Sequence, residues 1–374
     1  MHPRSPSSWA RRLAGVLAVA AVAAATVLTP TAAWAAGPGP YGAGFVWLDT
    51  PDASMCIAPA ERQWNSSSPW QPVNEVCGED VGLYSVYLPG QAARAGSVQV
   101  TAYGSDAAYC KIQSWAPSGT SQRVLVRCLD HHGAPTDSQF TLSYTNRAGT
   151  GGSPMAYVFA NQPTTASYTP PANYQYNSTG ATNTITRSAT EVGVYTVNAP
   201  GIGTAGGHVQ VTAYGTGREW CTAWNWLASG TAERVQVRCY SATGAPADSR
   251  FTMSFVKNGN ILGTGVCCNS DGHPTSYLFA SNPTAASYEP VAAYRFLSGT
   301  SRITRLAAGR YQVNYGWAAA PGAVNVTTVG GGGARCKVES YVSAEVATVA
   351  CHTTGGAPVD ATFLLHHVGP FVVG

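Results

Sequence analysis

An aspartate that recurs three times is the first candidate for chemistry in this 374-residue chain. Asp137, Asp248 and Asp360 each end a Gly-Ala-Pro-x-Asp motif. A carboxylate could act as a general acid or base, but no second recurring carboxylate stands beside it. The motif is typical of a turn, because proline presets one dihedral and the carboxylate can accept from backbone amides two residues on. We therefore interpret the three aspartates as structural.

Histidine and serine form no catalytic pattern. The eight histidines recur nowhere, and alternation along a strand would send the side chains of His131-His132 and of His366-His367 to opposite faces. The chain has no Gly-x-Ser-x-Gly elbow, no His-Glu-x-x-His motif and no phosphate loop. Its many serines and threonines indicate solvated strand faces. We expect no catalytic residue, no metal and no cofactor; distant paired carboxylates of glycosidase type are the enzymatic alternative.

Three neighbouring tryptophans favour a binding surface. Within residues 220–226, Cys221 must share a face with Cys239 if the two form a disulfide across adjacent strands. Cys239 shares its face with Val235 and Val237, which we expect to point inward, so in a strand without a bulge the tryptophans point outward. Indoles beside Arg and Gln suit a sugar ring or an aromatic ligand. The predicted surface comprises Trp220, Trp224, Trp226, Arg234, Gln236 and Arg238.

A repeated unit must position these side chains. The segment from Val192 to Val256 has one counterpart before it, from Val81 to Tyr144, and a less similar one after it, from Ala308 to His366. Corresponding cysteines of the first two copies are 111 positions apart. The predicted divisions are a signal peptide at 1–35 and modules at 43–152, 153–272 and 273–374, with junctions near 147–153 and 257–273.

The copies refine the interpretation of the tryptophans. Trp226 has counterparts in Trp115 and Tyr341, which favours a structural lid over the strand end. Trp220 and Trp224 are specific to the second copy. The alternative to a ligand surface is packing of these rings against a loop or an adjoining copy.

Hydrophobic periodicity predicts strands throughout. Apolar residues alternate with period two, as in Val98-x-Val100 and Val209-x-Val211, and no segment after residue 35 shows a sustained helical period. Gly, Pro, Asn or Ser interrupts these runs roughly every eight to twelve residues. We predict an all-β protein of three tandem antiparallel β-sandwich modules, for which a jelly roll is one arrangement.

All ten cysteines follow residue 35, and an even number in an exported chain indicates five disulfides. Three pairs follow from the repeat, because each copy holds its own two cysteines, and a fourth lies inside the first copy. The remaining two would form a vicinal disulfide, with a bond to another chain or free thiols as alternatives. The spacings are not those of zinc knuckles. The predicted pairs are Cys110–Cys128, Cys221–Cys239, Cys336–Cys351, Cys56–Cys77 and Cys267–Cys268.

The first 35 residues are typical of an export signal. Three arginines accompany the apolar run Leu13 to Leu28, and Ala33-Trp34-Ala35 fits the cleavage rule. The run is short for a membrane anchor, and the Arg11-Arg12 pair leaves both the general secretory and the twin-arginine routes open. Removing residues 1–35 takes away three of the 21 basic residues and none of the 18 acidic ones, which leaves 18 of each. This balance argues against nucleic acid or an anionic membrane as the partner of the mature, extracellular chain.

The repeated text resembles a known kind of sequence. The strings VQVTAYG, V-x-V-R-C and GAP-x-DS, followed by AYVFANQPTTASYTP, are similar to repeats of secreted actinobacterial proteins of no assigned function. The third copy departs from the pattern at Val329 and Ala361. The Tyr-Asn-Ser turn before Gly-x-Tyr is similar to a C1q-like jelly roll. These resemblances imply an exported β-repeat protein and assign no role to any residue.

The sequence therefore predicts a secreted, non-catalytic binding or adhesion protein, with an extracellular glycan or cell-wall polymer as its partner and avidity as the reason for copying. One alternative is a structural spacer of the cell envelope or matrix. A second is an exported hydrolase with its site at a module junction.

Overall fold

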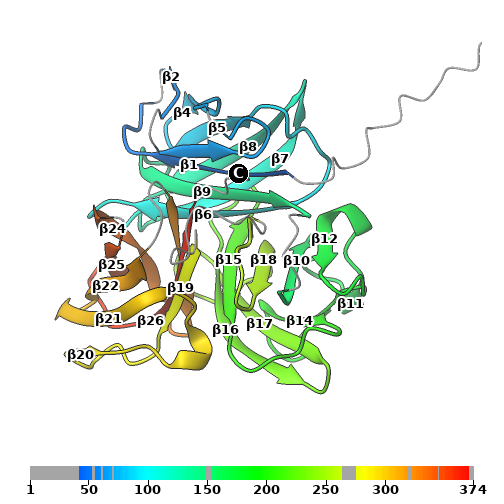
Figure 1. Ribbon diagram of the computed structural model, residues 1–374, viewed down its shortest axis with the longest axis vertical. Helices are drawn as coiled ribbons and strands as arrows, with labels where there is room; N and C mark the ends of the chain where they lie inside the picture. The colour runs from blue at the N-terminus through cyan, green and yellow to red at the C-terminus, as the bar shows by residue number, and fades with distance from the viewer. Residues whose placement is uncertain are drawn as a thin grey trace, which may run out of the picture. The chain divides into compact units, whose positions relative to one another are not determined.

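The computed structural model describes residues 42–52, 55–59, 62–69, 71–147, 153–262, 275–317, 322–343 and 345–369. These residues form 26 β-strands and two short 3₁₀ helices (Figure 1), which confirms the predicted all-β class. The expected signal peptide and the predicted Cys267–Cys268 pair lie outside the described residues. Within the described part of the chain, no helix is long and apolar enough to span a membrane.

The first copy is a sandwich of two facing sheets. Its strands are β1 (Gly42–Leu48), β2 (Cys56–Ile57), β3 (Gln63–Asn65), β4 (Glu75–Asp80), β5 (Leu83–Leu88), β6 (Ser97–Tyr103), β7 (Tyr109–Ser118), β8 (Ser121–Leu129) and β9 (Gln139–Asn146). One sheet contains β3, β1, β9 and β6, and the other β2, β4, β5, β8 and β7. The alternating Val98 and Val100 of β6 join Val124 and Val126 of β8 in one buried core, as period two predicts.

The second and third copies repeat this plan, each around its own core. The second copy consists of β10 (Met155–Ala160), β11 (Ser167–Tyr168), η1 (Ala172–Tyr174), β12 (Gln175–Asn177), β13 (Thr184–Arg187), β14 (Val194–Ala199), β15 (His208–Tyr214), β16 (Trp220–Ser229), β17 (Ala232–Tyr240) and β18 (Arg250–Val256). The third consists of β19 (Thr275–Ala280), β20 (Ser287–Tyr288), η2 (Ala292–Tyr294), β21 (Ser298–Ala307), β22 (Arg310–Trp317), β23 (Ala323–Val329), β24 (Arg335–Ser343), β25 (Val346–His352) and β26 (Thr362–Val368).

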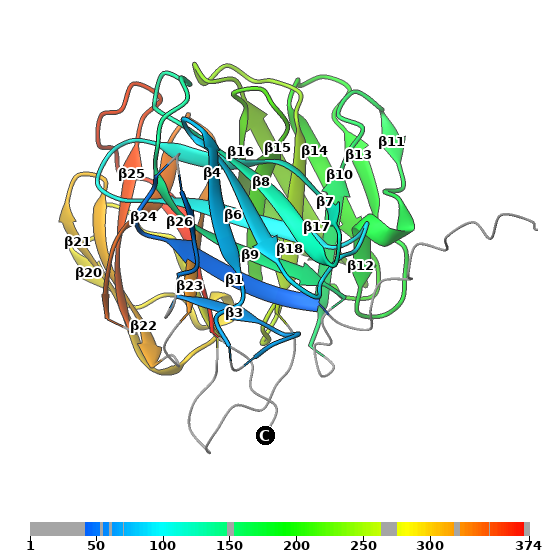
Figure 2. The ribbon, with the colours of Figure 1, turned by 90° about the horizontal axis from the view of Figure 1, so that it is seen from above.

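Each of the three sheets is shared between two modules (Figure 2). In each module, one group of strands ends at a central strand, which is β6, β15 or β23. This central strand makes a parallel contact with β24, β7 or β16, respectively, of a neighbouring module, so the sheet continues into that module. The same backbone hydrogen bond closes every junction, from the amide that follows the central strand to the neighbouring carbonyl. These bonds are Gly104 N to Val338 O (2.9 Å), Gly215 N to Ile112 O (2.8 Å) and Gly330 N to Ala223 O (2.8 Å). The modules therefore close into a ring and do not form an open row.

A ring of three buried threonines lies where the central strands meet. Thr101, Thr212 and Thr327 occupy equivalent positions on β6, β15 and β23. Each hydroxyl accepts a hydrogen bond from a valine amide of a neighbouring module. The three bonds are Val100 N to Thr212 Oγ1 (3.2 Å), Val211 N to Thr327 Oγ1 (3.0 Å) and Val326 N to Thr101 Oγ1 (2.9 Å).

The polar faces of these central strands are buried. Thr212 donates to Gln99 at 2.8 Å and Thr327 donates to Gln210 at 2.9 Å, both between modules. The interpretation of the serines and threonines as solvated strand faces is therefore wrong for these strands. Their polar side chains face another copy of the repeat, where the three threonines find partners that water would otherwise supply.

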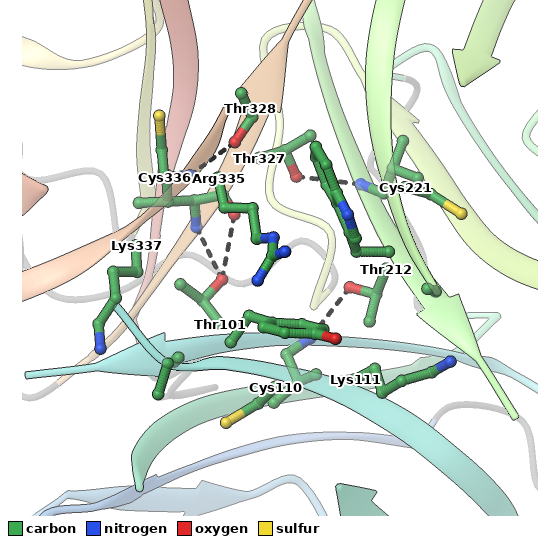
Figure 3. Close-up of a pocket in the computed structure, with 18 of the residues that line it drawn as sticks. Thr101, Cys110, Lys111, Thr212, Cys221, Thr327, Thr328, Arg335, Cys336 and Lys337 are labelled. Carbon is green, nitrogen blue, oxygen red and sulfur yellow. Dashed lines mark hydrogen bonds between the residues drawn. The ribbon is translucent and has the colours of Figure 1, made fainter. Parts of the chain in front are cut away.

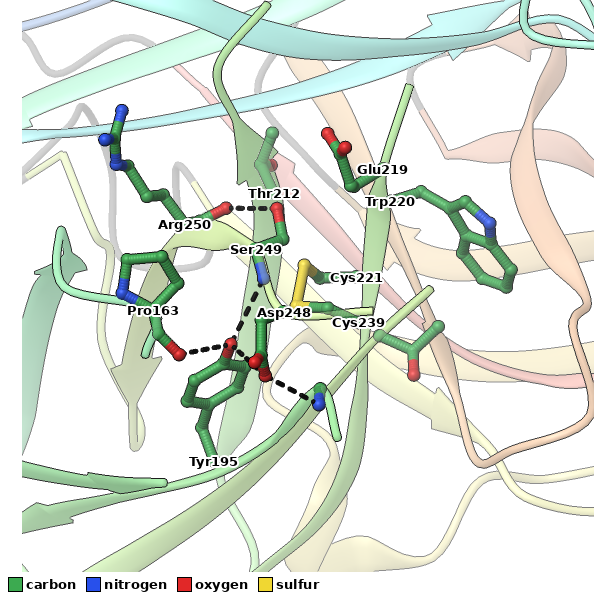
Figure 4. Close-up of a disulfide and its surroundings, with 12 residues drawn as sticks. Pro163, Tyr195, Thr212, Glu219, Trp220, Cys221, Cys239, Asp248, Ser249 and Arg250 are labelled. Carbon is green, nitrogen blue, oxygen red and sulfur yellow. Dashed lines mark hydrogen bonds between the residues drawn. A yellow bond between two sulfur atoms is a disulfide. The ribbon is translucent and has the colours of Figure 1, made fainter. Parts of the chain in front are cut away.

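The recurring aspartate is a long-range clasp between strands. In the second copy, the carboxylate of Asp248 accepts from the amide of Gly193 at 2.9 Å and from the hydroxyl of Tyr195 at 3.1 Å (Figure 4). Asp137 and Asp360 make the same pair of contacts in their own copies. The structural role is as expected, but these partners lie about fifty residues earlier in the chain and are not the amides two residues on that the turn motif suggested.

An arginine strengthens the clasp in the last two copies. Arg187 makes an ion pair of 2.8 Å with Asp248, and Arg305 makes one of 2.9 Å with Asp360. Hydrogen bonds from Arg305 lower the pKa of Asp360 to about 2, although burial acts in the opposite direction. The carboxylate thus stays ionised at any ordinary pH and holds its partners.

Four predicted disulfides are present: Cys56–Cys77, Cys110–Cys128, Cys221–Cys239 and Cys336–Cys351. The last three are equivalent, and each joins directly opposed residues of adjacent strands with Cα atoms 4.0 Å apart. Four such bonds indicate an oxidising, extracellular-like environment.

We predict that Gly193→Ala destabilises the fold far more than Gly230→Ala. Both glycines have positive φ, +72° and +62°, so both substitutions incur the left-handed penalty of about 1–2 kcal/mol. A Cβ at Gly193 would also lie 2.5 Å from the carbonyl oxygen of Cys239, whereas one at Gly230 meets nothing within 4 Å. In urea unfolding, Gly193→Ala should lose at least about 3 kcal/mol. Equal losses in the two variants would contradict the clasp geometry.

The threonine ring yields a second prediction. Thr212→Val keeps the shape of the side chain but leaves the buried amide of Val100 without its acceptor, which should cost about 1–3 kcal/mol of unfolding free energy. Thr186→Val, on the exposed face of β13, is the matched control and should change stability by less than about 0.5 kcal/mol. Thermal unfolding measures both, and indistinguishable values would show that the ring contributes nothing.

Candidate functional site

The three tryptophans of β16 do not share one face. The pairing of β16 with β17 shifts by one residue between Ala223 and Asn225, so the strand bulges at Trp224. Beyond the bulge, Trp226 lies opposite Val235 and points inward. The expectation that all three indoles point outward is therefore wrong, because the alternation on which it rested is broken inside the segment.

Trp226 is buried against the third module. Its ring makes edge contacts with Phe279 at 5.2 Å and Tyr294 at 5.5 Å, and its Nε1 donates to the carbonyl of Gly206 at 3.1 Å. Its two counterparts pack against neighbouring modules in the same way, Trp115 on the second and Tyr341 on the first. This position is a structural lid, as its recurrence indicated.

Trp220 is also buried, with 6% of its surface exposed. It stacks on Tyr240 at 4.7 Å and donates from Nε1 to the carbonyl of Ser241 at 3.0 Å. The alternative to ligand contact is packing against neighbouring elements. Such packing explains the position of the Trp220 ring, and it explains that of Trp226 too.

Trp224 remains at the surface, with 37% of its area exposed. The guanidinium of Arg238 lies over its ring at 3.6 Å, close enough for a cation–π contact. On the same outer face of β17, Arg234 is exposed and Gln236 is half-buried. Of the predicted surface, Trp224, Arg234, Gln236 and Arg238 thus lie where a ligand could reach them.

Arg238 also lines a hollow of about 370 Å³. Glu191 lies 3.7 Å from Arg238, and Val192 beside it is 49% exposed. Tyr240 and Pro246 contribute apolar atoms to the lining of this hollow. The hollow therefore combines apolar surface with one cationic donor and one carboxylate acceptor, as small-ligand sites do.

Among the three equivalent positions, all of which the structure describes, an indole stands only in the second module. Residues equivalent to Trp224 are Gln113 in the first copy and Glu339 in the third, and each pairs with an arginine: Gln113 with Arg127 at 3.0 Å and Glu339 with Arg310 at 2.6 Å. The scaffold is repeated, whereas the exposed indole is not.

A second cavity, of about 70 Å³, lies where the three modules meet, and we call it the axial cavity (Figure 3). The residues that precede the three repeated cysteines, Tyr109, Trp220 and Arg335, all line it. Arg335 is 7% exposed, and its guanidinium lies 4.2 Å from the centre of the Tyr109 ring and 5.2 Å from that of Trp220. Sequence reasoning missed this cluster, although three unlike residues at one repeated position were a visible signal.

The lining of the axial cavity bears on the hydrolase alternative. Among the described residues that line it there is neither a carboxylate nor a serine beside a histidine. In the part of the chain that the structure describes, one group of three metal-ligand side chains gathers, Cys56, Glu75 and Cys77, and its two sulfurs are joined to each other.

The paired histidines of β26 are buried on opposite faces. His366 lies 4.9 Å from His208, whereas His367 stacks on Tyr315 at 5.4 Å. Burial lowers the pKa of both His366 and His367 to about 3, so both are neutral at physiological pH. They act as core residues on opposite faces, as alternation predicts. His131 and His132 instead lie in a turn with their ring centroids 3.8 Å apart, so the expectation of opposite faces is wrong for that pair.

Comparison with known proteins gives no match to a family model, a curated protein or a solved structure.

The different burial of the two indoles makes a direct prediction. Trp220→Ala should lower the free energy of unfolding by about 3–5 kcal/mol, because it empties a packed site. Trp224→Ala should lower it by about 1–2 kcal/mol, since 37% of this ring is already exposed and it loses mainly contacts with Arg238 and Gly331. Urea unfolding of both variants decides the point, and a large loss in Trp224→Ala would show that this ring is structural.

Proposed function

We propose that this is a secreted, non-catalytic binding protein whose second module takes a glycan or cell-wall polymer at the surface formed by Trp224, Arg238 and the adjoining hollow. The observation that carries the proposal is an exposed indole, absent from the equivalent positions of the other two copies, whose stacked arginine also lines a ligand-sized hollow. Sugars offer apolar ring faces together with hydroxyls, and this surface offers an aromatic ring with a donor and an acceptor.

Secretion is supported by the predicted signal at residues 1–35 and by the four disulfides. The equal numbers of acidic and basic residues after residue 35 favour a neutral polymer over nucleic acid or an anionic membrane.

The geometry changes one part of the sequence-based hypothesis. Avidity from the copied modules requires more than one site per chain, but the residues that match Trp224 are a glutamine and a glutamate. One site per chain is therefore proposed, on a scaffold that the other two modules complete.

Both alternatives have less support. A spacer gains length from modules joined end to end, whereas these modules close into a ring. A hydrolase at the module junction would be favoured by two carboxylates, or a serine beside a histidine, in the axial cavity, and its described lining has neither arrangement.

The proposal predicts a selective loss of binding in Trp224→Ala. In pull-downs with a panel of insoluble glycans and cell-wall preparations, the unchanged protein should be retained by at least one polymer and Trp224→Ala by none, with a melting temperature that stays within a few degrees. Leu227→Ala is the control, because Leu227 is 49% exposed on the same strand outside the hollow.

Two results would count against the proposal. The unchanged protein binding nothing across the panel would remove it. If the polymer retained Trp224→Ala as well as it retained Leu227→Ala, the binding site would lie elsewhere on the protein.

A further inference from the structure

The geometry points to a second ligand site, distinct from the glycan surface: the axial cavity binds one small anion, such as a halide or a short carboxylate, on the guanidinium of Arg335.

The first argument is the set of hydrogen-bond donors. Nη2 of Arg335 donates to the carbonyl of Ala242 at 2.8 Å. The buried Nε and Nη1 of the same group have no hydrogen-bond acceptor among the described residues. A guanidinium keeps its charge and its five N–H donors when buried, so these two nitrogens favour an acceptor that is not part of the described chain.

The second argument is the distribution of charge. Two other cations line the cavity, but each has its own carboxylate: Lys111 pairs with Glu219 at 3.1 Å, and Lys337 pairs with Asp106 at 2.5 Å. In Figure 3 the side chains of these lysines run outward, whereas Arg335 points to the centre. The charge that faces the cavity is therefore that of Arg335.

The aromatic neighbours do not replace an anion. Tyr109 and Trp220 lie near the guanidinium at 4.2 and 5.2 Å between centres, and such contacts stabilise a cation through the faces of the rings. They supply no acceptor in the direction of the N–H bonds. Asp130, which acts on Arg335 through its charge, is occupied by the amides of His132 and Ala134.

Size selects the ligand. About 70 Å³ admits a few waters or one small anion and is far below the roughly 300 Å³ at which pockets for larger ligands begin. The hydroxyls of Thr101, Thr212 and Thr327 at the inner end already donate to other groups. Arg335 is thus the group that would hold the anion.

The experiment uses the full mature chain, purified in gluconate, an anion too large for the cavity. Gluconate is exchanged for bromide, chloride or acetate at constant ionic strength, and both the melting temperature and the tryptophan fluorescence are followed. We expect a saturable rise in melting temperature, together with bromide quenching of Trp220. Saturation by acetate alone would assign the site to carboxylates, and saturation by the halides as well would assign it to small anions in general; either supports the proposal.

Arg335→Gln tests the residue, with Arg234→Gln, the same change of charge on the exposed face of β17, as its control. Arg335→Gln should weaken the anion response at least tenfold, and Arg234→Gln should not alter it. An equal response in both variants overturns the proposal, as does the lack of any saturable response in the unchanged protein.

Bromide-soaked crystals of the unchanged protein decide independently should Arg335→Gln fail to fold. An anomalous peak within hydrogen-bonding distance of Nε or Nη1 supports the site, and a cavity without bromide density overturns it. Trp224→Ala should bind the anion normally, which keeps this test separate from that of the glycan surface.

Discussion

The rest of the structure depends on the burial of both faces of the three central strands, β6, β15 and β23. One face carries valines into the core of its own module. The other carries threonine with glutamine or asparagine, and the threonine hydroxyls accept hydrogen bonds from the neighbouring modules. Because every buried polar group needs a partner, no module can satisfy this face by itself once water is excluded. Three copies in one chain supply the partners at the right stoichiometry.

This arrangement explains why the lids and sheet junctions recur. Trp115, Trp226 and Tyr341 each cover a phenylalanine or tryptophan of the following module, or of the first in the case of Tyr341. A separated module would expose these rings and the edge of its central strand, which is a template for pairing with another chain. When the three modules close into a ring, both the aromatic side chains and the strand edge are covered, so the modules stabilise one another.

The sequence predicts local features well and contacts between copies poorly. Alternation of apolar residues is a property of one strand, so it predicted the all-β class, and the repeat paired the cysteines correctly. The clasp of Asp248 with Tyr195 was hidden because the two residues stand 53 positions apart and each had a sufficient local explanation. The bulge at Trp224 was hidden because one inserted residue changes the facing of a strand without altering its composition.

The polar faces show a deeper limit. In one copy, the pattern Val-Gln-Val-Thr is the same whether the polar side faces water or a second copy of the strand. The number of copies is what bears on the choice between water and a second strand, and the three copies are evident in the sequence. A triplicated unit with a strongly alternating central strand is therefore compatible with a closed ring as well as with an open row.

Difference between copies is the better guide to function in such a ring. Residues that recur in all three, such as the clasp and the lids, are those that the scaffold requires of every module. Where the scaffold leaves a side chain free, the copies have diverged: Tyr109, Trp220 and Arg335 stand at one equivalent position, and Gln113, Trp224 and Glu339 at another. The first set lines the axial cavity, and the second does not. A symmetric frame with unlike side chains at equivalent points can build one asymmetric site from three modules, which a true homotrimer cannot do.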